Sequence, residues 1–261
     1  MMTSTISPNS ILRRLLPPAF WLGVWQFGAW FIDLSMNGKG NELLLPYPTT
    51  VVNTLLELGQ TPEFWMNTGA SLGRILVGMV LGTLFGLLLA AITCLSPIAD
   101  ELLSPAIKVI RATPVASFIL LVLLWVYRDW VPVVIAALMV LPVVWGNVSR
   151  GIRETDPQLL ELAKAYRFSR GKTLRLIYLP SLQPYLISAI TTSMGLAWKS
   201  GAAAEILCLP KRSIGTQIYN TKYYFEIPEL FAWTATVVTL SLLMEWWLTA
   251  FLNRVQRRGQ P

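Results

Sequence analysis

Long apolar runs separated by short polar segments make up most of this 261-residue chain. The first run, residues 15–34, is long enough to cross a hydrocarbon core of about 30 Å as an α-helix. The pattern predicts an all-α, polytopic membrane protein with six transmembrane helices. The expected spans are residues 15–34, 69–95, a third helix entered after the turn 96–105 and containing the apolar run 115–126, and residues 131–148, 184–207 and 230–252.

A cleaved signal peptide is the alternative interpretation of the first run, which follows Arg13 and Arg14. The run is too long for an ordinary signal-peptide core, and the sequence DLSMNGKG after it offers no small-x-small cleavage site. The sequence favours an uncleaved helix that starts inside the cell. Beyond this span, a short amphipathic helix is expected near residues 50–58.

Composition agrees with a membrane protein, because 54% of the residues are hydrophobic and only 13% are charged. The chain has no histidine and only two cysteines, Cys94 and Cys208, so Ser-His and Cys-His catalysis and histidine-based metal sites are excluded. We expect no enzyme active site. The net charge of +7 could suggest nucleic acid. In a protein whose partner is the lipid bilayer, however, basic residues mark the cytoplasmic side, and no nucleic acid partner is expected.

The distribution of basic residues predicts the orientation. Residues 1–14, 96–111, 149–183 and 253–261 hold two, two, seven and three Lys and Arg, which is 14 of the 21. Five more lie in the predicted external segments, and Arg74 and Lys199 lie within spans. By the positive-inside rule, both termini are expected in the cytoplasm.

Small residues recur at four-residue spacing in two of the predicted helices. The ridge Gly78, Gly82, Gly86 and Ala90 predicts close packing of a second helix, since no side chains separate the backbones. Arg74, one turn before it, must contact a carboxylate, a carbonyl group or water, or else extend to the outer interface. The fifth predicted span carries a similar ridge: Ala189, Ser193, Ala197, Gly201 and Glu205.

Polar side chains and a predicted kink at Pro114 indicate a pathway along the third and fifth helices. The kink could equally serve packing. Lys199 and Arg111 would suit an anion, although Lys199 could instead pair with Glu205 or Glu245. The candidate pathway residues are Arg111, Thr113, Ser117, Trp198, Lys199 and Glu205.

Residues 154–181, within the longest predicted cytoplasmic segment (residues 149–183), have the signals of two short helices. Asp156 is a good N-cap and Pro157 a good first residue for a helix that ends near residue 167. Ser169 can cap a second helix, which we expect Pro180 to end. The apolar positions Leu159, Leu162, Ala163 and Tyr166 fall on one face of the first helix. This face could lie in a groove of a soluble partner or on anionic lipid.

The same segment resembles the EAA signature of ABC importer permeases. That signature has Glu-Ala-Ala, Gly at its seventh place, Ile at its seventeenth and Leu-Pro at its nineteenth and twentieth. Glu161, Ala163, Ile177, Leu179 and Pro180 fit this spacing, whereas Leu162 replaces the first Ala and Arg167 replaces the Gly. The Gly normally allows a sharp turn between two coupling helices, so Arg167 is unexpected there.

Nearly the whole chain, from about residue 20 to 252, is similar to the nitrate/sulfonate/taurine type of these permeases. The resemblance lies in LPYPTTVV, SLGRILVGMVLGTLFG, SPAIKVIRATPVASF and AWKSGAAAEILCLPKRSIGTQIY. It implies one transmembrane domain over residues 1–261 with a type I ABC importer permease-like (MetI-like) fold in a bacterial inner membrane. It also makes residues 154–181 a coupling segment, with ATPase-coupling residues Asp156, Leu159, Glu161, Leu162, Ala163, Tyr166, Arg167, Ile177, Leu179 and Pro180.

The resemblance further implies the partners: a second permease copy forming a homodimer, two cytoplasmic ABC ATPases and an external substrate-binding protein. The chain itself has no phosphate-binding loop, because GKT at residues 171–173 lacks the upstream glycine and has Tyr166 in its place. ATP and Mg²⁺ are therefore expected on the ATPase, with no cofactor in this chain. The solute could be a sulfonate, a nitrate-like anion or a vitamin precursor.

An ion-coupled secondary transporter is the alternative function, which would need acidic residues within the membrane. Only Asp33, Glu205 and Glu245 lie in or near the predicted spans.

Overall fold

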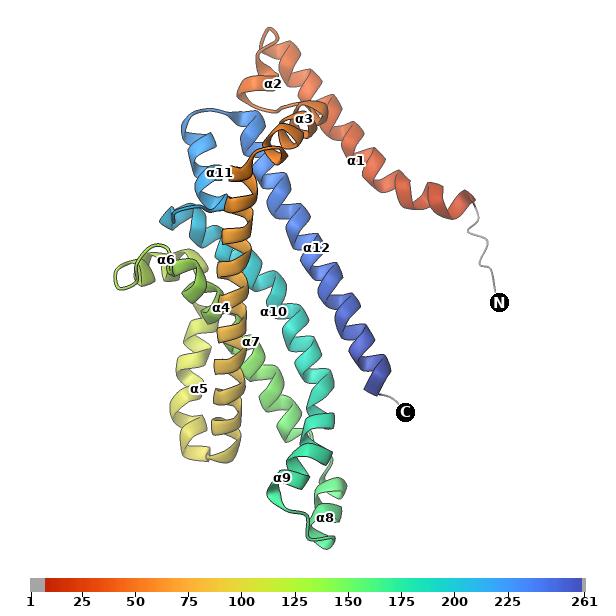
Figure 1. Ribbon diagram of the computed structural model, residues 1–261, viewed down its shortest axis with the longest axis vertical. Helices are drawn as coiled ribbons and strands as arrows, with labels where there is room; N and C mark the ends of the chain where they lie inside the picture. Colours follow the sequence, from red (N-terminus) through yellow and green to blue (C-terminus); the bar gives the residue numbers. More distant parts are fainter. Residues whose placement is uncertain (1–7, 260–261) are drawn as a thin grey trace. The chain divides into compact units, whose positions relative to one another are not determined.

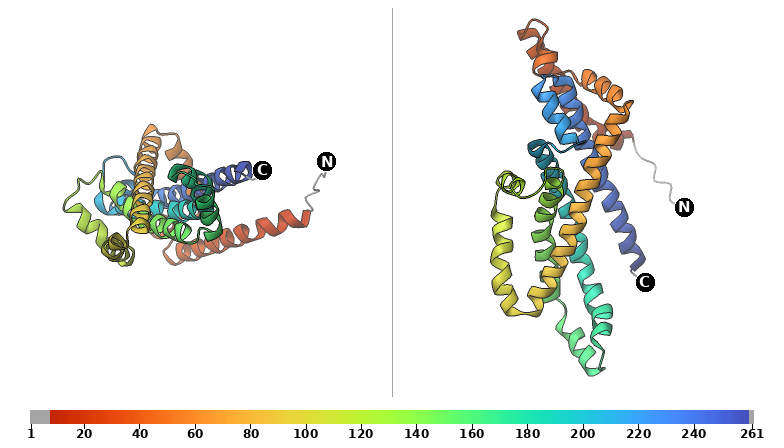
Figure 2. Two further views of the ribbon diagram at one scale, coloured as in Figure 1. Left: turned by 90° about the horizontal axis from the view of Figure 1, so that it is seen from below. Right: turned by 60° about the vertical axis from the view of Figure 1, so that its left-hand side comes forward.

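The structure, a computed structural model, describes residues 8–259 (Figures 1 and 2). Its regular elements within these residues are all helices, which confirms the predicted all-α class. In chain order they are α1 (Pro8–Ser35), α2 (Gly40–Leu43), α3 (Pro48–Gly59), α4 (Pro62–Leu95), α5 (Pro97–Ala112), α6 (Val115–Leu123), α7 (Val131–Arg153), α8 (Pro157–Ala165), α9 (Arg170–Thr173), the π-helix η1 (Leu174–Tyr178), α10 (Leu179–Cys208), α11 (Ile214–Tyr223) and α12 (Ile227–Gly259).

Contacts within the chain group these elements into two units. Unit 1 comprises residues 8–65 together with Gln217–Thr236, and unit 2 comprises Met66–Thr216 together with residues 237–259. Unit 2 holds the coupling segment and all of the candidate pathway residues. It is therefore the unit that positions the predicted site.

The core of unit 2 is built on α7 and α10, which pack extensively against each other. The unit 2 part of α4 packs on α7 through the predicted glycine ridge. A Cβ atom added to Gly78 would lie 2.4 Å from the carbonyl oxygen of Val133, and one added to Gly82 would lie 2.5 Å from that of Ala137. Only glycine allows so close an approach, so the predicted packing role of the ridge is confirmed.

The second ridge packs in the same way. All five of its positions on α10, from Ala189 to Glu205, are buried. A Cβ atom on Gly201 would lie 2.6 Å from Cγ1 of Ile75 on α4, so this glycine admits the Ile75 side chain. Together α4, α7 and α10 form the packed interior that the small residues predicted.

The third predicted helix differs from its expectation at its start and at its kink. Residues 96–105 were expected to form a turn, but α5 begins at Pro97, with the Ser96 hydroxyl accepting a hydrogen bond from the N–H of Ala99. Proline at a helix start is favourable, so a proline that marks a turn in sequence also begins this helix. The expected kink at Pro114 is confirmed in position, but it is a break of 107° between α5 and α6.

Three described helices are long and apolar enough to cross a membrane: Pro62–Leu95, Val131–Arg153 and Ile227–Leu252. The bent pair α5 and α6 would make a fourth if the two form one broken span. The first and fifth predicted spans lie within α1 and α10, which are helical over the expected residues. By length and composition, the described residues thus contain three or four candidate spans, and six spans stay a prediction.

Unit 1 contains α1, α2, α3 and the start of α12. The Asp33 carboxylate accepts hydrogen bonds from the N–H of Asn41 at 3.1 Å and from the hydroxyl of Tyr47 at 3.0 Å. These bonds hold the turn after α1 in place. The helix expected near residues 50–58 is α3, which confirms that prediction.

Candidate functional site

The first helix of the coupling segment, α8, starts as its sequence predicts. The Asp156 carboxylate accepts a hydrogen bond from the N–H of Gln158 at 2.8 Å, and Pro157 is the first helical residue. This cap satisfies one of the N–H groups that a helix start leaves without a partner. The helix ends at Ala165, two residues before the expected end.

Arg167, which stands where the EAA signature has glycine, lies in the turn after α8. The N–H of Phe168 donates to the carbonyl of Ala163 at 2.8 Å, and the N–H of Arg167 donates to that of Lys164 at 3.0 Å. This pair of bonds is a Schellman motif, which places the residue after the helix cap in the left-handed region. Arg167 has a φ of 50° there, so it adopts the conformation that glycine would supply without steric strain.

The second half of the coupling segment is helical up to and through Pro180. The Ser169 hydroxyl accepts the N–H of Lys172 at 3.3 Å and starts α9, as predicted. α9 continues through η1 into α10, which begins at Leu179. The expectation that Pro180 ends a helix is wrong, because the backbone stays helical from α9 through η1 into α10. The π-helical turn lies directly before Pro180, where the N–H of Leu179 donates to the carbonyl of Leu174, and such local adjustments accommodate a proline inside a helix.

The side chains of the coupling segment divide into a buried and an exposed set. Ala163 and Ile177 are buried and anchor α8 and η1 within unit 2. Leu159 is 42% exposed, Leu162 50% and Tyr166 71%, which leaves much of the apolar face of α8 uncovered. Figures 1 and 2 show α8 and α9 beside each other where the chain enters α10. The other predicted coupling residues, Asp156, Glu161, Arg167, Leu179 and Pro180, are also exposed.

A hollow of about 540 Å³ lies between α5, α7 and α10. Arg111 and Thr113, two of the predicted pathway residues, line it together with Asn147, Arg150 and Thr192. The break after α5 places Arg111 and Thr113 at this hollow. We call it the pathway hollow.

The other four predicted pathway residues do not line the pathway hollow. Trp198 is buried and donates its indole N–H to the carbonyl of Val237 at 3.0 Å. Ser117 and Lys199 are exposed on α6 and α10. A pathway role for these residues stays a prediction.

Glu205, the fourth of them, belongs to a buried cluster instead. Its carboxylate pairs with the Arg74 guanidinium at 3.2 Å and accepts the Ser71 hydroxyl at 2.7 Å and the N–H of Gly215 at 3.3 Å. Arg74 also donates to the carbonyls of Lys211 and Arg212. The expectation that Arg74 finds a carboxylate or carbonyl group is confirmed, and the alternative pairing of Lys199 with Glu205 is wrong.

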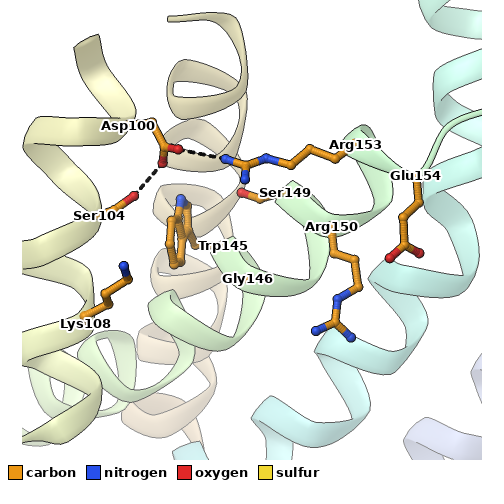
Figure 3. Close-up of a pocket in the computed structure, with 9 residues that line it drawn as sticks. All are labelled: Asp100, Ser104, Lys108, Trp145, Gly146, Ser149, Arg150, Arg153 and Glu154. Carbon is orange, nitrogen blue, oxygen red and sulfur yellow. Dashed lines mark hydrogen bonds and ion pairs between the residues drawn. The ribbon is translucent and has the colours of Figure 1, made fainter. Parts of the chain in front are cut away.

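A second hollow, of about 390 Å³, lies between α5 and α7, and the sequence reasoning missed it (Figure 3). We call it the Ser149 hollow. The signal for it was present as a four-residue spacing of polar side chains, which puts them on one face of a helix. The lining residues on α5 are Asp100, Ser104 and Lys108. Those on α7 are Trp145, Gly146, Ser149, Arg150 and Arg153, and Glu154 follows directly after the end of α7.

Comparison with known proteins assigns the family. A sequence model of the family described as "Binding-protein-dependent transport system inner membrane component" matches residues 82–257, more than half of the chain. The chain belongs to this family. It is accordingly the permease subunit of an ATP-binding-cassette importer, and its relatives include permeases named for aliphatic sulfonates and for taurine.

Individual relatives support this assignment. The chain is 27% identical to an aliphatic sulfonates transport permease protein of Bacillus subtilis over 85% of this chain and 78% of that one. It is 30% identical to the Escherichia coli protein of the same description over 82% and 81% of the two chains. A crystal structure of an amino acid ABC transporter with histidines matches the fold with a TM-score of 0.63 at 19% identity, over 78% of this chain and 97% of that one.

Proposed function

We propose that the coupling segment of this permease docks on a cytoplasmic ABC ATPase. In the proposed assembly, two copies of the permease form a homodimer with two ATPases, which bind ATP and Mg²⁺. Each copy is a single domain with six spans and both termini in the cytoplasm, and an external binding protein delivers the solute. The family assignment and the distribution of basic residues support this arrangement.

The uncovered apolar face of α8 is the observation that carries the proposal. The side chains of Leu159, Leu162 and Tyr166 are exposed and mostly apolar, so burying them in the groove of a partner protein is more favourable than leaving them in water. The Asp156 cap and the Schellman turn at Arg167 hold both ends of α8. A helix fixed in this way can transmit a movement of the ATPase to α7 and α10, which flank the coupling segment in the chain.

Copurification tests the docking proposal. Glu161 is exposed on α8, so Glu161→Ala can weaken docking without disturbing the interior. We expect the variant to lose most of the copurified ATPase, whereas Glu101→Ala, at an exposed glutamate of α5, retains it. ATP-independent solute uptake by this chain alone would contradict the proposal.

The proposed solute is a small anion such as a sulfonate. The relatives named as sulfonate permeases and the position of Arg111 in the pathway hollow support this class. The decisive test is ATPase stimulation of the full complex by its loaded binding protein across sulfonates, nitrate and neutral vitamin precursors. Stimulation by a neutral solute alone would contradict an anionic substrate.

Arg111 gives a sharper test within this chain. Because it lines the pathway hollow, we expect Arg111→Gln to lower uptake of an anionic solute about tenfold, the effect of losing a charge-assisted hydrogen bond. Arg128→Gln, at an exposed arginine between α6 and α7, should leave uptake unchanged. Lys199→Ala tests the prediction for Lys199 in the same assay, and unchanged uptake would remove Lys199 from the pathway.

A further inference from the structure

The Ser149 hollow has no role in the function proposed so far. It adjoins the pathway hollow, because Gly146 and Arg150 line both. Its remaining walls come from one face of α5 and the last turns of α7, immediately before the coupling segment (Figure 3). The charged and polar groups that face it come from these two helices and from Glu154.

The charged groups of the Ser149 hollow leave two cations without an acidic partner. The Asp100 carboxylate is occupied by Arg153 at 2.8 Å and by the Ser104 hydroxyl, and Glu154 accepts the hydroxyl of Tyr185. Among the described residues, no carboxylate lies within ion-pair distance of Lys108 or Arg150. With three basic and two acidic side chains, the lining has a net positive charge.

Ser149 adds an independent observation that points to a ligand. Its side chain is only 6% exposed, and its Oγ atom has no hydrogen-bond partner in the part of the chain that the structure describes. A buried hydroxyl left without a partner costs about 1–3 kcal/mol. The buried Thr93 hydroxyl nearby is satisfied, because it donates to the carbonyl of Leu89 and accepts the Trp145 indole N–H at 3.0 Å. Asn67, Thr68 and Ser193 also have a buried polar atom without a partner among the described residues, but of these four side chains only Ser149 lines this hollow.

We propose that the Ser149 hollow is an oxyanion-binding site that takes a sulfate, sulfonate or phosphate group. Lys108 and Arg150 supply the positive charge and N–H donors, and the Ser149 hydroxyl supplies a third donor in the lining of the same hollow. All three can donate to an acceptor-only ligand, which is what an ionised oxyanion is. The Asp100–Arg153 pair joins α5 to α7 beside the site and holds its two walls together.

The oxyanion could be free in the cytoplasm or belong to an anionic lipid headgroup. Both sources present the same oxygens to Lys108, Arg150 and Ser149, so the chemistry of the site is common to them. Nanodiscs of two lipid compositions distinguish them. Phosphatidylcholine offers only zwitterionic headgroups, whereas phosphatidylglycerol offers anionic headgroups that compete with a free ion.

The test is binding of radiolabelled sulfate to the purified permease complex in phosphatidylcholine nanodiscs, without ATP and with phosphate as competitor. We expect saturable binding that weakens about tenfold in Lys108→Gln and severalfold in Ser149→Ala. Lys222→Gln, at an exposed lysine of α11, should bind like the unaltered protein. Unchanged thermal unfolding of each variant shows that the fold is intact.

Each outcome decides the proposal. Equal binding in both lipids assigns the site to a free oxyanion, and displacement by phosphatidylglycerol assigns it to a headgroup. Sulfate binding that is absent in phosphatidylcholine, or that is unaffected by both Lys108→Gln and Ser149→Ala, overturns it. Because the measurement needs neither the substrate nor transport, its failure leaves the proposed docking of the ATPase untouched.

Discussion

The coupling segment and the cluster around Glu205 are stabilised by contacts of very different range. In the coupling segment, the bonds of Asp156, Ser169 and Phe168 join residues two to five positions apart. Around Glu205, the side-chain bonds to Ser71 and Arg74 join residues 134 and 131 positions apart. The first region is therefore ordered locally and leaves side chains free for a partner, whereas the second fixes α4, α10 and the start of α11 within unit 2.

Substitution of Glu205 should have the largest effect on stability. Glu205→Ala leaves Arg74 without its carboxylate in the interior, and breaking a buried ion pair in this way costs about 3–5 kcal/mol. We expect a large drop in Tm of the purified permease, with a smaller drop for Glu205→Gln, which keeps an acceptor for Ser71 and Gly215. Glu245→Gln, at an exposed glutamate of α12, is the control. Equal Tm values for Glu205→Ala and the control would contradict a stabilising role of the cluster.

The glycine ridge of α4 provides the next largest effect. Gly82→Ala would place a methyl group 2.5 Å from the carbonyl oxygen of Ala137, and such overpacking costs about 1–3 kcal/mol. Gly73→Ala on the same helix meets no atom within 4 Å and should be neutral or stabilising, because alanine favours helix. Thermal unfolding of the two variants measures the difference. Equal stability of the pair would show that α4 does not pack on α7 as described.

Arg167 provides the smallest effect and tests the local order of the coupling segment. Arg167→Gly removes the strain of a left-handed residue and should stabilise the turn by about 1 kcal/mol, less the added flexibility of glycine in the unfolded chain. Arg167→Ala keeps a Cβ atom and should gain little. Hydrogen exchange of the Phe168 amide reports the turn directly. If alanine protects this amide as well as glycine does, the size or charge of arginine matters rather than its backbone conformation.

The sequence was sufficient for features that depend on neighbouring residues. Asp156, Pro157 and Ser169 predicted the starts of α8 and α9 correctly, because a helix cap is a contact over two or three residues. The expectation for Pro180 was wrong, since the π-helical turn η1 directly before it lets the helix continue through a proline. The start of α5 at Pro97 was missed because a proline is typical both of a turn and of a helix start.

Features that depend on distant contacts were predicted only in part. Arg74 was expected to need a carboxylate or carbonyl group, but nothing in its own helix identifies Glu205 as the partner. The Ser149 hollow likewise requires one face of α5 to meet one face of α7. The spacing of Asp100, Ser104 and Lys108 places them on one face of α5, but it does not identify the residues of α7 that lie opposite. The glycine ridge was the exception, because three glycines at four-residue spacing allow few other arrangements.

Photo-crosslinking from the exposed face of α8 tests the central claim most directly. In the assembled importer, a photoreactive residue replaces Leu162, which is 50% exposed. The control carries the same residue in place of Leu102, which is exposed on α5. Docking of the coupling segment predicts a covalent adduct with the ATPase from position 162 and none from position 102. Adducts with lipid alone from position 162 would contradict the claim and place α8 on the membrane surface.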